Sequence, residues 1–429
     1  IYSNRSINSS GAAIEDNELH QVSVANLFGS SGTLKDDPQK NYWLNLLGYN
    51  VPSTGTVTLA DVMTKPELRQ VGSTMHSTPI LLTQEGKITV TNGVLDTTDR
   101  KDYLLFGTTQ GLLHVVKAGK DTVTSTGGYN YDGDGGKEVF TFVPNEMMGD
   151  ATNTGQREAF LADGGASAGG ASSLFYGIDA PWAAYTEYVS KKDGSLTVGS
   201  TDIDDTSTQG KQWVYGGLRM GGQSYYALDL TTIDKPKLKF HIDPANEKIY
   251  SAGSSATSAS ALQYMGQSWS KPTIAQVKFN GAVKTVMIVG GGYDAGYEAA
   301  DYDPDTAKGN GVYMFDADTG ALLWWASSSA SANGGAIEKT EVSNMTYSVV
   351  SQINAIDRDN DGLVDNLYFG DLGGQAFRVD LDNTASSTSG FAKRVVRLIN
   401  QHVATGGTSP RFYEMPSFSV HHDTNIGFY

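Results

Sequence analysis

The fold is decided by residues 357–380, which read DRDNDGLVDNLYFGDLGGQAFRVD. The second part of this stretch contains an apolar strand that ends at Gly370, a glycine-rich turn, and a further strand that ends at Asp380. The same arrangement occurs three times earlier in the chain, at residues 103–115, 213–229 and 287–316. A repeat of this kind predicts one supersecondary unit that is used several times.

Additional strands flank these pairs. A proline-containing strand precedes the first strand of a unit, as at residues 76–80 and 271–274, and an apolar strand follows the second, as at residues 139–142 and 322–325. Four strands per unit predict the blades of a β-propeller. We therefore expect an all-β fold, a modified β-propeller of about five to seven four-stranded blades with long loop insertions. The last residues, from 414 onward, are interpreted as the opening of a further blade.

The N-terminal part of the chain departs from the repeat. Residues 1–50 are interpreted as an irregular segment with one short helix, for which Asp37 is the predicted N-cap and Pro38 the first residue. This helix is expected to end at Gly48. Residues 51–429 are interpreted as the propeller domain, which carries the loop of residues 357–365.

Composition limits the class of protein. The 429 residues carry a formal net charge of −16, which disfavours nucleic acid and anionic membrane surfaces as partners. The chain has no cysteine, so it forms neither a disulfide nor a Cys-ligated metal site. No apolar run approaches the ~18 residues that a membrane helix needs, and we expect no membrane insertion. Because the sequence does not begin with methionine, we expect it to be part of a longer protein.

The first nine residues of the quoted stretch have the spacing of a calcium-binding loop. Carboxylates stand at positions 1, 3, 5 and 9, and a glycine stands at position 6. In such loops alternate residues turn hard oxygen atoms toward one centre. The predicted Ca²⁺ ligands are the side chains of Asp357, Asp359 and Asp361, the backbone carbonyl of Leu363, and Asp365 directly or through water.

The flanks of this loop indicate strands. An EF-hand needs a helix on each side and a glutamate at position 12, but position 12 is Tyr368 and residues 348–350 and 367–369 favour strands. We predict a calcium loop between two strands, in which Gly362 allows a turn that a side chain would obstruct. The alternative is a solvated acidic turn with Arg358 as its internal counter-charge.

A second acidic loop repeats the spacing. A weaker Ca²⁺ site is therefore predicted at Asn130, Asp132, Asp134, Gly136 and Glu138. The alternative is an ordinary turn, because Gly-Asp-Gly runs are common in turns. Residues 301–305 also alternate aspartates, but they lack the glycine at position 6 and contain a proline, so they are interpreted as a surface loop.

Several blocks of the sequence resemble one family. Residues 72–79, 216–229, 268–272 and above all 357–380 are similar to the C-terminal domain of the PilC/PilY proteins of the type IV pilus tip. The resemblance extends from about Trp43 to the end of the chain. It is most specific in the calcium loop and in the residues that follow it.

This resemblance implies a modified β-propeller exposed outside a Gram-negative cell, at the pilus tip or associated with the outer membrane. Members of the family act in pilus biogenesis, oppose pilus retraction, support twitching motility and DNA uptake, and adhere to host cells or surfaces. The implied partners are minor pilins and a receptor on a host cell or an abiotic surface, without direct binding of nucleic acid. The family's calcium loop corresponds to Asp357, Asp359, Asp361, Leu363 and Asp365.

Two other interpretations stay open. Residues 227–229 after a glycine turn, and the run 322–325, also resemble the blades of quinone-dependent dehydrogenases, which would make the chain an enzyme. Such enzymes gather calcium ligands from separate blades, and the sequence has no nucleophile elbow, metalloprotease helix motif or phosphate-binding loop. We therefore expect a non-catalytic protein without catalytic residues. In the second alternative, calcium only stabilises one hairpin and has no regulatory role.

Overall fold

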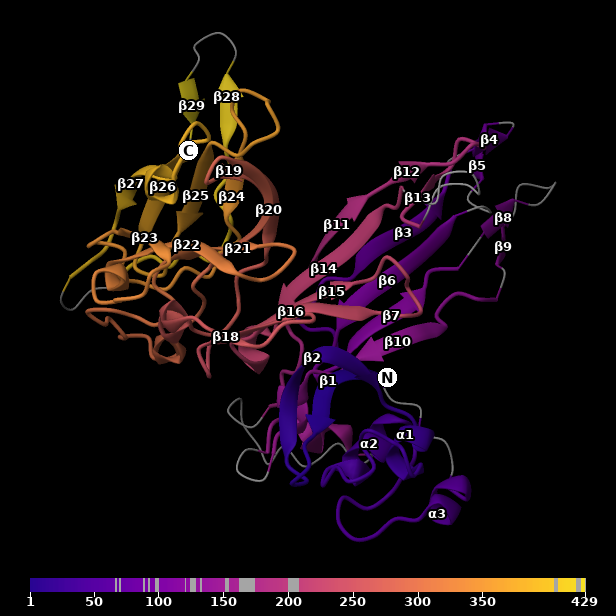
Figure 1. Ribbon diagram of the computed structural model, residues 1–429. Coiled ribbons are helices and arrows are strands. Elements are labelled where there is room, and N and C mark those ends of the chain that lie inside the picture. Colours follow the sequence, from indigo (N-terminus) through magenta and orange to yellow (C-terminus); the bar gives the residue numbers. More distant parts are fainter. Residues whose placement is uncertain are drawn as a thin grey trace. The chain divides into compact units, whose positions relative to one another are not determined.

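The computed structural model describes residues 1–65, 68, 71–87, 89–91, 93–96, 100–119, 121–123, 129–131, 133–150, 154–161, 174–199, 208–404, 408–421 and 426–428. These residues form an all-β protein with a few short helices (Figure 1). They divide into two compact units: unit 1 contains residues 1–215 and 227–238, and unit 2 contains residues 216–226 and 239–429. No helix among the described residues is long and apolar enough to cross a membrane.

The repeat predicted from the sequence is present as four runs of four neighbouring strands. The first run is β3 (Ile80–Gly86), β6 (Lys101–Gly107), β7 (Leu113–Lys117) and β10 (Glu138–Phe142). The second is β11 (Ala183–Glu187), β14 (Lys211–Gly217), β15 (Tyr225–Asp229) and β16 (Lys237–Asp243). The third is β19 (Thr273–Phe279), β20 (Ala282–Gly290), β21 (Val312–Asp316) and β22 (Leu322–Ser327). The fourth is β24 (Asn354–Ile356), β25 (Asn366–Gly370), β26 (Gln375–Leu381) and β27 (Ala392–Asn400). The all-β blade architecture is thereby confirmed, and the number of blades stays a prediction.

Further strands extend three of these runs. Strand β10 pairs in parallel with β1 (Tyr2–Ile7), which pairs with β2 (Ala13–Gln21). Strand β16 pairs with β17 (Lys248–Ser251), which pairs with β18 (Thr257–Ser258), and β22 pairs in parallel with β23 (Glu338–Glu341). Next to β3 lie β13 (Leu196–Thr197) and then β12 (Val189–Ser190). Three hairpins stand apart: β4 (Thr89–Thr91) with β5 (Val94–Asp96), β8 (Asp121–Val123) with β9 (Tyr129–Tyr131), and β28 (Ser419–His421) with β29 (Ile426–Phe428).

Close packing explains the glycine that ends the second strand of each run. A Cβ atom added at Gly107, Gly217, Gly290 or Gly370 would lie between 2.2 and 2.7 Å from an atom of a neighbouring segment. The atoms it would meet are the carbonyl oxygens of Ile178, Ser268 and Val349 and the Cβ of Phe412. Ile178, Ser268 and Val349 each stand five residues before the first strand of the next run. The repeated glycine therefore lets each run contact the segment that leads into the next one.

The core of unit 2 lies between the third and fourth runs. Most residues of the inner strands are buried on both faces, and alternate residues, which share one face of a strand, pack into the same core. They form one cluster that contains Ile288, Met314, Trp324, Leu367, Phe369, Phe377 and Val379. Trp324 and its neighbour Trp325 are both completely buried, so they serve as core residues rather than as a ligand platform.

The prediction that residues 1–50 are irregular is wrong for the first strands. Residues 2–7 and 13–21 form β1 and β2, and they belong to the same sheet as the first run. Their sequences are polar, and Ser3, Asn4 and Arg5 are fully buried in spite of it. Hydrophobic periodicity misses such strands, because pairing with β10 and buried hydrogen bonds stabilise them instead. The division of the chain into domains at residue 50 stays a prediction.

The predicted short helix is present, with a different start. Helix α2 (Lys40–Leu46) buries Trp43 and Leu44, but its N-cap residue is Gln39 and not Asp37. Asp37 is buried and accepts hydrogen bonds from Arg5 and Trp43. The other α-helices are α1 (Val24–Phe28), α3 (Leu59–Met63) and α4 (Asn145–Met148). The 3₁₀ helices within the described part of the chain are η1 (Arg157–Phe160), η3 (Arg219–Gly221), η4 (Ser260–Tyr264), η5 (Ala295–Glu298), η6 (Ser328–Ala330) and η7 (Thr388–Gly390).

Candidate metal centre

The loop of residues 357–365 joins two strands, as predicted. It connects β24 to β25, which pair in antiparallel fashion, with Ile356 opposite Asn366. Residues 358–362 are exposed at the tip of this hairpin. The fourth run therefore presents the loop to solvent on a two-stranded base.

The structure brings three of the predicted ligands together. Asp357, Asp359 and Asp361 each offer a carboxylate oxygen, and these oxygens all lie within 4.8 Å of one another. Asp359 and Asp361 are exposed, and Asp357 is half-buried. Like charges at this separation repel each other, and a cluster of hard oxygens is the donor set that Ca²⁺ prefers. The three side chains therefore fit a calcium ion.

Hydrogen bonds to the backbone orient these carboxylates. Asp357 accepts through Oδ1 from the amide of Asn360 at 2.6 Å and through Oδ2 from the amide of Gly362 at 2.8 Å. Asp361 accepts through Oδ1 from the amide of Leu363 at 2.8 Å, and Asp359 accepts from the amide of Asp361 at 3.2 Å. Such local bonds curl the chain around the carboxylates, so they bring the three side chains to one side of the loop.

Asp365 occupies a different position from the three grouped aspartates. Its Oδ2 accepts from the amide of Arg358 at 2.8 Å, which closes the base of the loop. Among the described residues, Asp365 is not a member of the cluster that Asp357, Asp359 and Asp361 form. Its contact with the ion, and that of the Leu363 carbonyl, stay predictions.

The sequence analysis did not identify Asn383, which supports the loop from the turn that follows β26. Its Nδ2 donates to the carbonyl of Val364 at 3.0 Å, and its Oδ1 accepts from the amide of Lys278 in β19 at 3.0 Å. The amide of Val364 also donates to the carbonyl of Gln276 in β19 at 2.9 Å. The calcium loop is thus fastened to the third run as well as to its own hairpin. The only signal in the sequence is an Asp-Asn-Thr turn at residues 382–384.

Gly362 is required for a reason other than the one predicted. Its φ is +91°, which is the left-handed region that favours glycine. A Cβ atom at this position would meet no heavy atom within 4 Å, so a side chain would not be obstructed. The constraint is the backbone conformation itself.

Replacing Gly362 with alanine is expected to weaken Ca²⁺ binding about fivefold, because the left-handed conformation costs an alanine ~1 kcal/mol. We expect the exposed loop of the alanine variant to relax out of the left-handed conformation when it is free of metal, so the cost would appear on binding. Calcium titration of the G362A variant measures it. The control is Gly334→Ala, because a Cβ atom at Gly334 also meets no heavy atom within 4 Å and its φ lies outside the left-handed region. Equal affinity of G362A and wild type would contradict this account of the turn.

The second predicted loop is only partly described. Asn130 lies in β9, and Asp132 lies outside the described residues. Asp134 forms ion pairs with Lys137 and with Lys117, the latter at 3.0 Å, and these lysines lower its pKa to about 2. The amide of Gly136 donates to the carbonyl of Lys117 at 2.8 Å.

Glu138 of the second loop has partners of its own. Its carboxylate accepts from Thr141 and lies 2.7 Å from Nδ1 of His114. Burial acts to raise the pKa of Glu138, but these hydrogen bonds outweigh it and hold the pKa below its ordinary value. Two of the predicted carboxylates are therefore engaged with other side chains, and the second calcium site stays a prediction.

The chain was compared with known protein families and with solved structures. Residues 107–400, which include the calcium loop, match the family model of the PilY1 β-propeller domain. The chain belongs to the PilY1 β-propeller family. Its strand runs are accordingly those of a PilY1 β-propeller domain, and the family resemblance predicted from residues 357–380 is confirmed.

Solved structures that resemble this PilY1-family chain include the crystal structure of the Pseudomonas aeruginosa PilY1 C-terminal domain. The two chains share 18% sequence identity with a TM-score of 0.39, and the match covers 75% of this chain and 50% of that chain. The chain thus spans about half the length of that structure. A search of curated protein sequences gave no match.

Proposed function

We propose that this PilY1-family propeller binds Ca²⁺ with Asp357, Asp359, Asp361, Leu363 and Asp365. The observation that carries the proposal is the grouping of three carboxylate oxygens within 4.8 Å in a strand-flanked loop. Ca²⁺ takes oxygen ligands from carboxylates and backbone carbonyls, and its charge would offset the repulsion among the aspartates. The second loop at Asn130, Asp132, Asp134, Gly136 and Glu138 is proposed as a weaker site.

The hydrogen bonds between this loop and β19 suggest how a bound ion would affect the fold. Val364 and Asn383 join the loop to β19 through hydrogen bonds of 2.9 to 3.0 Å. An ion that fixes the loop also fixes this connection between the third and fourth runs. We infer that bound calcium rigidifies one edge of the propeller, and that its loss releases a self-repelling loop.

The biological role proposed is that of a non-catalytic adhesin and assembly factor of the type IV pilus. In this role the protein lies outside the cell at the pilus tip, contacts minor pilins, opposes retraction, and supports twitching motility, adhesion and possible DNA uptake. Membership of the PilY1 family supports the pilus association. A candidate calcium site built from one loop, rather than from several blades around a cofactor, supports a role without catalysis.

A strain that carries Asp361→Ala tests this role. The substitution removes a carboxylate from the centre of the cluster, and we expect surface pili and twitching zones to decrease by severalfold while the protein is still secreted. The control is Arg358→Ala, which changes an exposed residue of the same loop outside the ligand set. Wild-type pilus counts in the D361A strain would refute a calcium-dependent role in pilus assembly.

A further inference from the structure

The last strand of the fourth run has an open edge. In the other three runs the last strand pairs with a further strand: β10 with β1, β16 with β17, and β22 with β23. The sheet of the fourth run ends at β27, and no other strand of the described residues pairs with that edge (Figure 1). An open edge offers unpaired N–H and C=O groups to an added strand.

The hydrogen bonds of this sheet show which backbone groups face the open edge. The amide of Leu381 in β26 donates to the carbonyl of Asp365 at 2.8 Å, on the side of β25. Adjacent residues of a strand turn their backbone groups to opposite sides, so Asp380 turns its groups toward β27, where it lies opposite Arg394. By the same alternation the N–H and C=O of Val395, and of the residue two positions along, point away from β26.

Basic side chains line this edge. Lys393, Arg394 and Arg397 of β27 are exposed. Arg394 and an arginine of β26 both pair with Asp380, Lys393 interacts with Asp382, and Arg397 donates to a neutral glutamine, so four cations face two carboxylates. The edge therefore keeps an excess of positive charge in a chain whose net charge is −16. Opposite charges on neighbouring strands stabilise their pairing, so this edge favours an acidic strand.

Two bulges limit the length of strand that fits. In the pairing with β26, Lys393 and Leu398 are extra residues of β27. Bulges and charged residues protect natural edges against indiscriminate pairing. The stretch between the two bulges, residues 394–397, is regular, so the edge suits a short segment of matching charge.

An apolar groove of about 550 Å³ lies at the end of β27. The residues that line it are Gly370, Ala376, Ile399 and 411–416. The side chains of Ile399, Tyr413 and Met415 are 38% to 43% exposed, and covering them with an apolar group is favourable. The first three lining residues lie side by side on β25, β26 and β27. A residue opposite Ile399 on an added strand would continue this row into the groove.

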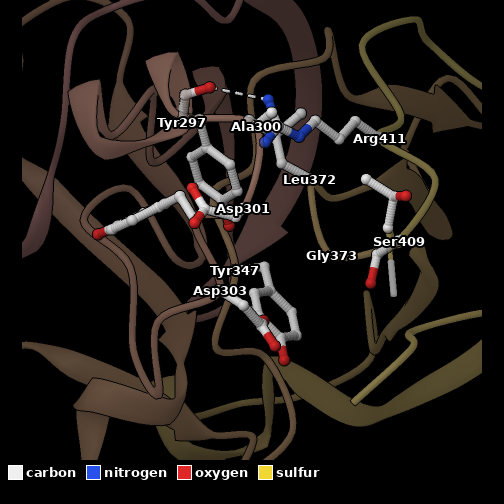
Figure 2. Close-up of a pocket in the computed structure, with 11 residues that line it drawn as sticks. Tyr297, Ala300, Asp301, Asp303, Tyr347, Leu372, Gly373, Ser409 and Arg411 are labelled. Carbon is white, nitrogen blue, oxygen red and sulfur yellow. Dashed lines mark hydrogen bonds between the residues drawn. The ribbon is translucent and has the colours of Figure 1, made fainter. Parts of the chain in front are cut away.

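The segment of residues 411–416, which forms the outer wall of the groove, is held at both ends. Figure 2 shows Arg411 reaching toward Tyr297, to whose carbonyl it donates at 2.8 Å. The guanidinium of Arg411 also lies 5.0 Å from the centroid of the Tyr297 ring. At the other end the carbonyl of Pro416 accepts from Nδ2 of Asn354 at 2.8 Å. The groove is therefore preformed.

We propose that the open edge of β27 binds an extended segment of a partner protein by strand addition. Acidic side chains of this segment face the basic residues of the edge, and an apolar side chain enters the groove. In this mode of recognition backbone hydrogen bonds supply affinity and side-chain pockets supply specificity. The inference gives a binding mode for the protein partners proposed above and rests on that proposal for its biological setting, whereas peptide binding is a property of the purified chain.

Calorimetric titration of the full chain with the end-blocked peptide FTETETF tests the proposal. The peptide places glutamate and phenylalanine on one face of a strand and reads the same in both directions, so it fits a parallel or an antiparallel partner. We expect saturable binding by wild type and about tenfold weaker binding by Lys393→Gln/Arg394→Gln, which corresponds to the loss of ~1.4 kcal/mol. The matched control is Lys237→Gln/Lys248→Gln, which removes the same charge from exposed lysines of β16 and β17.

Two N-methylated forms of the peptide test the backbone hydrogen bonds without any change in the protein. One form carries methyl groups on the threonine amides, and the other carries them on the glutamate amides. An added strand turns only one of these two sets of amides toward β27. One form is therefore expected to bind at least tenfold more weakly than FTETETF, and the other to bind as well as FTETETF.

Four results would overturn the proposal. They are no binding of FTETETF to wild type, equal binding of FTETETF and both methylated forms, equal binding of the lysine peptide FTKTKTF, and self-association of the free chain that Lys393→Gln/Arg394→Gln abolishes. The last result would assign the edge to a second copy of the chain. Failure of the calcium proposal is seen separately, because Asp361→Ala changes neither β27 nor the groove and is expected to leave peptide binding unchanged.

Discussion

Replacing Arg5 with alanine is expected to destabilise unit 1 by about 3–5 kcal/mol. Arg5 and Asp37 are completely buried and form a two-point ion pair, with Nε to Oδ2 at 2.7 Å and Nη2 to Oδ1 at 2.9 Å. Arg5 also donates through Nη1 to Asn145 at 2.9 Å and to the carbonyl of Gly149 at 2.7 Å. The alanine variant leaves the Asp37 carboxylate buried without its counter-charge, which is why the loss is large.

Thermal unfolding followed by circular dichroism measures this effect. The midpoint of the transition that includes unit 1 is expected to fall by about 10 °C. Lys35→Ala is the matched control, because Lys35 forms an exposed pair with Asp36 at 3.7 Å and such pairs contribute at most ~1 kcal/mol. An R5A midpoint within the range of the control would contradict the view that a buried ion pair fastens β1 to the helical segment.

Replacing Asp371 with asparagine is expected to remove a pH dependence of stability. Burial raises the pKa of Asp371 to about 7, although its carboxylate accepts hydrogen bonds from the amides of Gly373 and Gln375 and from the Gln375 side chain. Above pH ~7 the carboxyl is ionised in both folded and unfolded chains, and below pH ~4 it is protonated in both. Between these values the unfolded chain releases a proton that the folded chain keeps. The stability of wild type therefore falls as pH rises through this window.

The measurement compares wild type and D371N in chemical unfolding between pH 4 and 8. Other groups titrate equally in both proteins, so the difference between the two curves isolates Asp371. A pKa raised from 3.8 to about 7 predicts that the difference in unfolding free energy between wild type and D371N changes by about 4 kcal/mol across this pH range. If the difference in unfolding free energy between the two proteins were the same at all pH values, Asp371 would ionise normally in the folded state.

The sequence predicted the strands that depend on local pattern. The sequence pattern showed four apolar strands that end in glycine, at Gly107, Gly217, Gly290 and Gly370. The glycine recurs because a side chain at this position would clash with a neighbouring segment. The candidate calcium loop was recognisable because its proposed ligands are close in sequence, so their spacing alone predicts which side chains converge.

Features that depend on distant parts of the chain were not predictable. β1 and β2 are polar strands that exist because β10 and Asp37 provide partners more than 30 residues away. Asn383 supports the calcium loop from another turn, and its role becomes visible only when β19 and β26 are placed beside it. Residues 301–305 were interpreted as a surface loop, and only the structure sets Asp301 and Asp303 opposite Arg411 in a pocket.

Calorimetric titration of metal-stripped protein with Ca²⁺ tests the central claim most directly, with wild type and Asp361→Ala measured side by side. We predict saturable binding by wild type, a rise of its melting temperature in calcium because the loop is fastened to β19, and no saturable binding at the same site in D361A. The absence of binding to wild type, or equal binding by both proteins, would contradict the assignment of Asp357, Asp359 and Asp361 as calcium ligands.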